Sequence, residues 1–405
     1  MPKASDRESK NRHRYKRRSY FIVVTVLSAL VISSSALTQT REATLTCDGQ
    51  WHTVSAVDPA QQLGDFNSLN AVVAISSTDA WAVGQFHRFA GTDYDHPLVE
   101  HWDGTTWTVM PTPHPNLPIS LLDGIAASAS NDIWAVGYEK DLVSGYQILI
   151  EHWDGNAWTI VQDATSIGWL TSVAAVAPDN VWAVGSTDYI GKGLILHWNG
   201  STWRRTVLPD PIFLRDVTVV SDNDVWVVGQ LSHDGDGDYT YAAHFDGSMW
   251  SQVSTPSPLQ RHSIDQNWLT SVTALAADNI WAVGIMRDPD FGILDRTLVE
   301  HWDGSVWAVV TTPHLGRNIN NDFWGVVALD ANNIWSVGST GNDPDFQPLI
   351  EKWDGTTWSQ VATSSAGGVL LRVSGIGAPM ELWATGNRLK QNRYTGTLVE
   401  HFCTE

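Results

Sequence analysis

Trp81-Ala82-Val83-Gly84 is the first of seven copies of one short motif in this chain of 405 residues. The copies differ only at their second and third positions, and successive copies lie 44 to 55 residues apart. They begin at Trp81, Trp134, Trp182, Trp226, Trp281, Trp335 and Trp383. A motif that recurs at such a period marks a repeated structural unit rather than a catalytic signature.

Each unit can be read as four short strands, which we call a to d in chain order. In the third unit, residues 170–176 and 181–185 are apolar runs on either side of the turn signal Pro178-Asp179-Asn180. The third run, residues 194–198, leads into the hairpin dipeptide Asn199-Gly200. Runs that are apolar on both faces are typical of buried sheets. The sequence therefore predicts an all-β protein built from four-stranded antiparallel blades, a β-propeller.

A second motif, His-Trp-Asp-Gly-x-x-Trp, joins strands c and d. Its copies and variants are His101–Trp107, His152–Trp158, His197–Trp203, His244–Trp250, His301–Trp307 and Lys352–Trp358. The chain ends on residues 400–403, a strand c without a strand d, and residues 47–51 are a strand d without a strand c. We therefore expect a seven-bladed propeller over residues 47–405, its last blade closed by pairing of the N- and C-terminal strands.

The closure accounts for the two cysteines of the chain. Cys47 and Cys403 fall next to each other in the repeat alignment, across the closing blade. Adjacent cysteines in an oxidising compartment favour a disulfide, which we predict here. The alternative is a pair of free thiols.

The N-terminus predicts a location outside the cytoplasm, either secreted or on the cell surface. Residues 1–19 hold eight basic residues, an apolar stretch follows, and a small-x-small site ends at Ala36, as in a secretory signal peptide. The alternative is an uncleaved membrane anchor, because the 18 residues from Tyr20 to Leu37 suffice to span a bilayer. We assign residues 1–36 to this signal or anchor and residues 37–46 to a short leader.

The charge of the chain argues against nucleic acid as a partner. The sequence holds 24 basic and 44 acidic residues, a net charge of −20. A body this acidic is a poor partner for nucleic acid or an anionic membrane surface. We expect contact with a membrane only through the N-terminal segment, if it stays uncleaved.

The two motifs together resemble those of secreted bacterial β-propeller repeat proteins, which are grouped with the kelch and galactose-oxidase-like propellers. The turn at Asp103-Gly104-Thr105-Thr106-Trp107 is also similar to the Asp box of neuraminidase repeats, with one residue fewer between Asp and Trp. The resemblance implies a fold more than an activity. Galactose oxidase needs a cysteine for its copper cofactor, and both cysteines here are at the closure.

A sialidase-like activity would need three arginines that converge on a substrate carboxylate. The arginines that precede or begin strand a in different blades are Arg215, Arg261, Arg317 and Arg372. A hydrolase would also need paired acid and base groups. The only candidates that we name are Asp123, Asp216 and Asp322 at the starts of strands a; the alternative, which we favour, is that each of them satisfies a local backbone group.

The variable b–c and d–a loops share one face of such a fold, and function usually lies on variable loops held by a rigid scaffold. Three of the 22 tryptophans fall outside the repeat positions, at the ends of d–a loops: Trp169, Trp268 and Trp324. We predict that they ring the mouth of the central channel together with Arg215 and Arg372, and bind a carbohydrate or a protein. The alternative is that they plug the channel or wedge between blades.

Metal binding is predicted at one b–c loop only. Asp234, Asp236 and Asp238 alternate with glycines there, which suits calcium, although the distal glutamate of an EF-hand is missing. The alternative is a solvated acidic turn. The histidines that recur once per blade are expected to make structural hydrogen bonds. The sequence thus favours a non-catalytic binding or scaffolding propeller, with a carbohydrate-active enzyme as the alternative.

Overall fold

The described part of the chain consists of strands and their connections, without a helix. The computed structural model describes residues 45–89, 94–113, 117–141, 143, 145–161, 167–187, 191–233, 237–258, 266–288, 294–313, 315–316, 318–390 and 394–404. The prediction of an all-β protein is confirmed. Within these residues nothing meets the length and apolarity of a membrane-spanning helix. The predicted signal or anchor, residues 1–36, lies outside them.

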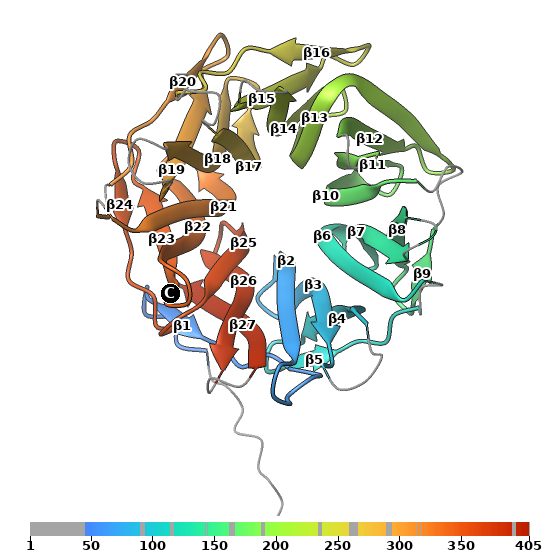
Figure 1. Cartoon of the computed structure of the whole chain (residues 1–405), viewed down its shortest axis with the longest axis vertical. Coiled ribbons are helices and arrows are strands. Elements are labelled where there is room, and N and C mark those ends of the chain that lie inside the picture. Colours follow the sequence, from blue (N-terminus) through green and yellow to red (C-terminus); the bar gives the residue numbers. More distant parts are fainter. Residues whose placement is uncertain are drawn as a thin grey trace, which may run out of the picture. The chain divides into compact units, whose positions relative to one another are not determined.

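Consecutive strands pair antiparallel in groups of four, and each group carries one copy of the Trp-x-x-Gly motif on its second strand (Figure 1). We number these units by their motif copies. Unit 1 comprises β2 (Phe66–Ser76), β3 (Asp79–His87), β4 (His96–Trp102) and β5 (Trp107–Val109). Unit 2 comprises β6 (Ile119–Ala129), β7 (Asp132–Asp141), β8 (Gly145–Trp153) and β9 (Trp158–Ile160). Unit 3 comprises β10 (Trp169–Ala177), β11 (Asn180–Ser186), β12 (Lys192–Trp198) and the first half of β13 (Trp203–Ser221).

The remaining units follow the same order. Unit 4 comprises the second half of β13, β14 (Asp224–His233), β15 (Gly237–Phe245) and β16 (Trp250–Val253). Unit 5 comprises β17 (Gln266–Ala276), β18 (Asn279–Asp288), β19 (Leu294–Trp302) and β20 (Trp307–Val309). Unit 6 comprises β21 (Asn320–Asp330), β22 (Asn333–Gly341), β23 (Gln347–Trp353) and β24 (Trp358–Gln360). Unit 7 comprises β25 (Val369–Ile376), β26 (Glu381–Lys390), β27 (Tyr394–Cys403) and β1 (Trp51–Thr53).

The strand β13 departs from the expected pattern, because strand d of unit 3 and strand a of unit 4 are one continuous strand of 19 residues. Its two halves pair with different units. Pro211 is still in register with Lys192 of β12, and Ile212 is already in register with Leu231 of β14. No residue between the two pairings is left to form a d–a loop.

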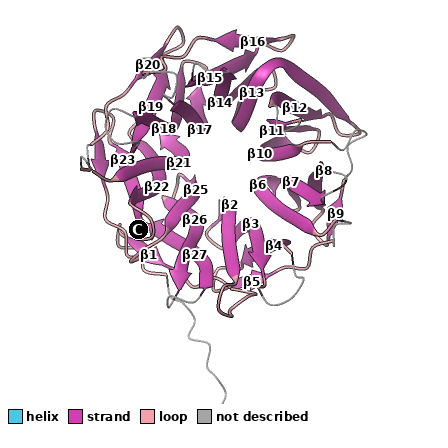
Figure 2. Cartoon of the chain, viewed as in Figure 1, coloured by secondary structure: helices cyan, strands magenta, loops and turns pink. Residues whose placement is uncertain are grey.

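The first strands of the units surround a common centre (Figures 1 and 2). Each contacts the first strand of the next unit, and β25 also contacts β2. The first and last described strands pair in unit 7, where Trp51 of β1 is in register with Phe402 of β27. Beside this pair, the sulfur atoms of Cys47 and Cys403 are 2.01 Å apart. The predicted disulfide is confirmed.

The repeated tryptophans hold neighbouring units together. The motif tryptophan Trp81 of unit 1 is buried against Trp153 and Trp158 of unit 2, with ring centroids 5.0 and 5.7 Å away. The same contact recurs from each unit to the next. At the closing unit it joins Trp335 to Phe402, at 4.9 Å, and to Trp51. Large aromatic surfaces buried at every junction account for the seven copies of the motif.

Candidate functional site

The glycine of the Trp-x-x-Gly motif is required by a bulge in the neighbouring first strand. In unit 4, a Cβ atom added to Gly229 would lie 2.0 Å from the carbonyl oxygen of Phe213. The strand register passes there from Leu214, paired with Gly229, to Asp216, which leaves Arg215 unpaired. The corresponding clash distance is 1.8 to 2.1 Å at all seven motif glycines. A bulge re-aims the side chain of its extra residue, so every unit turns one side chain away from the regular alternation.

The seven bulge residues line a single pocket at the centre of the ring of first strands. They are Asn70, Asp123, Thr171, Arg215, Thr270, Trp324 and Leu371. Arg372 completes the lining, and the cavity has a volume of about 230 Å³. We call this cavity the central pocket. It brings together three of the five predicted ligand-binding residues: Arg215, Trp324 and Arg372.

From unit 1 to unit 6, bulge residues that hydrogen-bond to the backbone of the next unit alternate with bulge residues that present their side chains to the central pocket. In units 1, 3 and 5 a short polar side chain bonds to the backbone of the next unit. The bonds run from Asn70 Nδ2 to Leu122 O (3.0 Å), from Thr171 Oγ1 to Leu214 O (3.0 Å) and from Thr270 Oγ1 to Phe323 O (2.7 Å). Each of these carbonyls directly precedes the bulge residue of an even-numbered unit. The small side chains therefore fix the backbone that presents Asp123, Arg215 and Trp324.

In unit 7 the polar contact to a neighbouring unit is made by Arg372, the residue that follows the bulge residue Leu371. Its Nη1 atom donates to the carbonyl oxygens of Trp324, at 2.6 Å, and of Leu371, at 3.1 Å. A second cavity, of about 320 Å³, continues along the first strands and also has Arg372 in its lining. Most residues in the lining of this second cavity are Ala and Val. Arg372 thus borders both cavities.

The central pocket holds two guanidinium groups and one carboxyl group. Burial raises the pKa of Asp123 to about 6, although Arg372, the hydrogen bond from Asn70 and Arg215 all act to lower it. Burial and the neighbouring charge of Arg372 lower the pKa of Arg215 from its ordinary value. Arg215 Nη2 donates to Gln230 Oε1 at 3.1 Å. Within the described residues, neither guanidinium has a carboxylate within the 4.0 Å of an ion pair.

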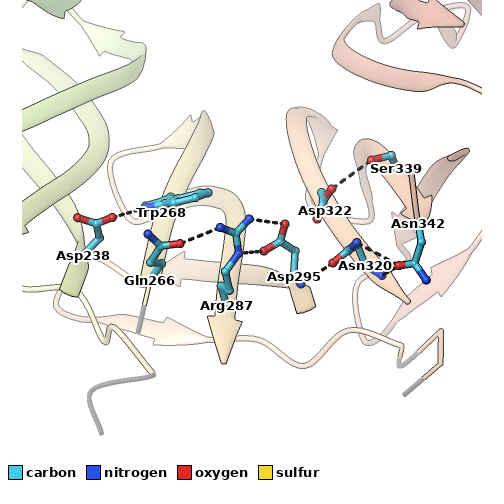
Figure 3. A network of polar contacts seen from close by, with 9 residues as sticks. All are labelled: Asp238, Gln266, Trp268, Arg287, Asp295, Asn320, Asp322, Ser339 and Asn342. Carbon is cyan, nitrogen blue, oxygen red and sulfur yellow. Dashed lines mark hydrogen bonds and ion pairs between the residues drawn. The ribbon is translucent and has the colours of Figure 1, made fainter. Parts of the chain in front are cut away.

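Trp169 and Trp268 do not line the central pocket. The ring of Trp169 packs against Tyr146, with centroids 5.0 Å apart. Trp268 belongs to a polar network on the strands of units 4 to 6 (Figure 3). Its Nε1 atom donates to Asp238 at 3.1 Å, and the guanidinium of Arg287 lies 5.3 Å from its ring centroid. Ligand binding by these two tryptophans stays a prediction.

The network of Figure 3 also fixes Arg287. Its Nη2 atom bonds to Asp295 at 2.8 Å and its Nη1 atom to Gln266 at 2.9 Å, while Asn320 accepts from the backbone of Asp295 at 2.9 Å. These bonds run from β17 through β18 and β19 to β21. They join unit 5 to unit 6, and they bind the guanidinium of Arg287 to partners within the protein.

The predicted calcium loop is described only in part. Asp238 accepts hydrogen bonds on both carboxylate oxygens, from Ser232 at 2.6 Å and from Trp268 at 3.1 Å. Asp234 and Asp236 lie outside the described residues, and calcium binding stays a prediction. Among the residues that are described, no three His, Cys, Asp or Glu side chains are grouped as metal ligands.

Two of the three carboxylates named as catalytic candidates are engaged elsewhere. Asp216 is buried and accepts from Ser172 at 2.5 Å, from Ser271 at 2.6 Å and from the backbone of Val272 at 2.9 Å. It therefore ties together the first strands of units 3, 4 and 5. Asp322 is buried beside Ser339, and burial together with the charge of Asp295 raises its pKa to about 7. Only Asp123 faces the central pocket.

The repeat histidines make the structural hydrogen bonds that were expected of them. In unit 2, His152 Nε2 lies 2.7 Å from Asp132 Oδ1, the same oxygen that accepts from Trp134 Nε1 at 3.2 Å. The imidazole ring also packs on the indole of Trp134, with centroids 4.3 Å apart. Equivalent bonds are made by His101, His197, His244, His301 and His401. Arg261 and Arg317, the other two arginines considered above, lie outside the described residues.

Sequence reasoning missed Asn70, Thr171, Thr270 and Leu371 as lining residues, although a signal for them exists. In units 1 to 6 the bulge residue stands 14 positions before the motif glycine, as Arg215 stands before Gly229. In unit 7 the offset is 15, because residues 377–380 make a longer a–b turn. An alignment of the repeats at this position would have identified all seven bulge residues.

The comparisons with known proteins identify the fold. No protein-family model and no curated protein matches this sequence. YCF48 bound to D1 peptide is 14% identical over 90% of this chain and 100% of its own, with a TM-score of 0.56. The Swd1 β-propeller domain of Myceliophteria thermophila is 9% identical over 88% and 100%, with a TM-score of 0.50. A PL25 ulvan lyase bound to -[GlcA(1-4)Rha3S]- is 11% identical over 82% and 93%, with a TM-score of 0.56. This chain is a β-propeller.

Proposed function

We propose that this chain is a non-catalytic, extracellular binding propeller that takes its ligand in the central pocket. One observation carries the proposal: the alternating ring of bulge residues presents Asp123, Arg215 and Trp324 from three different units toward one cavity. A polar cavity with an aromatic wall, built on rigid strands, has the features of a ligand site. Asn70, Thr171 and Thr270 support this wall through hydrogen bonds to backbone carbonyls.

The finer architecture belongs to the same proposal. We count seven blades, one per motif copy, closed by the pairing of β1 with β27. The cyclic contacts of the first strands support this count. The grouping with kelch and galactose-oxidase-like propellers is supported by the repeated c–d turn, where Asp103 Oδ1 accepts from the backbone of Thr105 and Thr106 at 2.9 Å. The extracellular location is supported by the Cys47–Cys403 disulfide, since such bonds persist in oxidising compartments.

A carbohydrate-active enzyme is the second candidate, and Asp123 is the observation that favours it. A carboxyl group whose pKa is raised to about 6 in a pocket is suited to general acid or base catalysis near neutral pH. Glycoside hydrolysis normally takes a second carboxyl group. Asp216, another of the candidate carboxylates, already accepts hydrogen bonds on both of its carboxylate oxygens. Binding is therefore the better supported function.

A screen of the full-length protein against glycan and peptide arrays tests the proposal. We expect retention of a ligand, loss of that retention in Trp324→Ala, and unchanged retention in the matched variant Trp169→Ala. Any ligand found is then incubated with wild-type protein and with Asp123→Asn. Release of product by the wild type alone would show that the protein is an enzyme and not a binding module. Equal retention by Trp324→Ala and the wild type would place the ligand outside the central pocket.

A further inference from the structure

We propose that the central pocket binds a carboxylate group of its ligand, held between the guanidinium groups of Arg215 and Arg372. This inference rests on the proposed function, since it names the chemical group that the same pocket recognises. It depends on three features of the pocket: the unpaired arginines, the balance of charge, and the neighbouring hydroxyl and indole groups.

The two arginines are held in place but are not neutralised. Arg215 is anchored through Nη2 to the buried Gln230, and Arg372 through Nη1 to two backbone carbonyls. A guanidinium has five N–H donors in a fixed fork. In the described part of the chain, the other nitrogen atoms of either group make no hydrogen bond. Donors therefore remain for a ligand on two guanidinium groups whose orientation is already set.

The charge of the pocket favours a monoanion. Arg215 and Arg372 are close enough to oppose each other's charge, and Asp123 is the only acidic side chain among the described residues of the lining. With Asp123 ionised, the lining carries one excess positive charge, in a protein whose net charge is −20. A bound anion of single charge would balance this excess and relieve the repulsion between the guanidiniums. A dianion such as phosphate would be opposed by the carboxylate of Asp123.

The shape of the donors favours a carboxylate among the monoanions. A guanidinium fork matches the two oxygens of a carboxylate. The hydroxyls of Thr171 and Thr270, which would serve a tetrahedral oxyanion, already donate to backbone carbonyls at 3.0 and 2.7 Å. Trp324 supplies an indole beside them, on which the apolar body of the ligand would pack.

The test uses five small probes on the full-length protein, by isothermal titration calorimetry at pH 7.5 and low salt. Methyl glucuronide and N-acetylglycine carry a carboxylate in a sugar and in a peptide setting, their methyl esters are the neutral controls, and inorganic phosphate is the dianion. We expect at least one carboxylate to bind at least ten-fold more tightly than its ester and than phosphate. The stronger of the two carboxylates then identifies the source of the group.

Variants connect the binding to the arginines. Arg215→Gln should weaken carboxylate binding at least ten-fold, Arg215→Lys should give an intermediate affinity, and Asp123→Asn should tighten it. Circular dichroism checks that each variant keeps its fold. Equal affinity for acid and ester, preference for phosphate, an unaltered affinity in a folded Arg215→Gln, or no binding of any probe would each overturn the inference. If the esters bind as tightly as the acids and Trp324→Ala abolishes their binding, the proposed function of the pocket would hold, but its preference for a carboxylate would be refuted.

Discussion

Asn70 of unit 1 and Asp123 of unit 2 share a hydrogen bond of 3.1 Å across the junction of their blades. The same amide nitrogen also donates to Leu122 O at 3.0 Å, so one side chain orients both the backbone and the carboxyl group of Asp123. The hydrogen bond from Asn70 is one of the three influences that lower the pKa of this carboxyl against the effect of burial. The junction of two units thus tunes the acidity of the central pocket.

Replacement of Asn70 by leucine should raise the pKa of Asp123 above its value of about 6. The leucine keeps the site excluded from water but removes the donor that stabilises the charged carboxylate. The measurement is an NMR titration of the Asp123 carboxyl carbon. The matched control is Thr270→Val, which removes an equivalent inter-unit bond, to Phe323 O, that does not involve Asp123. An unchanged titration in Asn70→Leu would show that this bond does not set the acidity.

The substitution Gly229→Ala should destabilise the protein and weaken binding at the central pocket. Its Cβ atom would meet Phe213 O at 2.0 Å, so the bulge that presents Arg215 would have to shift. We expect a loss of about 2–4 kcal/mol in the free energy of unfolding, as for the more severe point substitutions. Gly377→Ala is the control, because no atom lies within 4 Å of the added Cβ there. The check is chemical denaturation of both variants, and equal stability would contradict the role given to the motif glycine.

The sequence predicted the blades better than the site, because the blades depend on residues that repeat from unit to unit and the site depends on residues that change between units. Trp81 and its six equivalents bury the same surface at every junction, so the sequence repeats them and the period is legible. The bulge position instead carries different residues in most units, as Asp123, Arg215 and Trp324 show. Periodicity therefore conceals it. Trp268 was chosen for the opposite reason, as an aromatic outside the repeat, and its bond to Asp238 of β15 is a contact between two units that the spacing does not reveal.

Removal of the disulfide should lower stability without removing the pocket. The Cys47–Cys403 bond spans 356 residues and lies in unit 7, next to the paired ends of the chain. A crosslink over so long a loop is worth on the order of 5 kcal/mol in the chain-entropy model. We expect the double variant Cys47→Ser, Cys403→Ser to unfold at a lower denaturant concentration than the wild type. A reductant should move the wild type to the same midpoint and leave the variant where it is; coincident curves before reduction would contradict this.

The buried glutamates of the Glu-His-Trp segments and of their Glu-Lys-Trp variant should make the protein less stable as the pH rises. Glu300 is fully buried, neither of its carboxyl oxygens has a hydrogen-bond partner among the described residues, and burial raises its pKa from the ordinary 4.5 to about 8. Glu151 and Glu351 share all three properties. Between these two pH values the unfolded chain has lost a proton that the folded protein retains. The free energy of unfolding therefore falls with rising pH, by up to about 1.4 kcal/mol per pH unit for each such group.

Glu300→Gln, which cannot ionise, should make this dependence less steep between pH 5 and pH 8, by the share of one of the three groups. Glu300→Leu should reduce it equally, since unit 3 carries Leu196 at the same place in its third strand. The control is Asp303→Asn in the same unit, because hydrogen bonds from Ser305 and Val306 hold the pKa of Asp303 at about 2, below this range of pH. Denaturant midpoints measured at half-unit steps of pH supply the slopes. If the slope of Glu300→Gln equals that of the wild type, the buried carboxyl group of Glu300 does not drive the loss of stability at high pH.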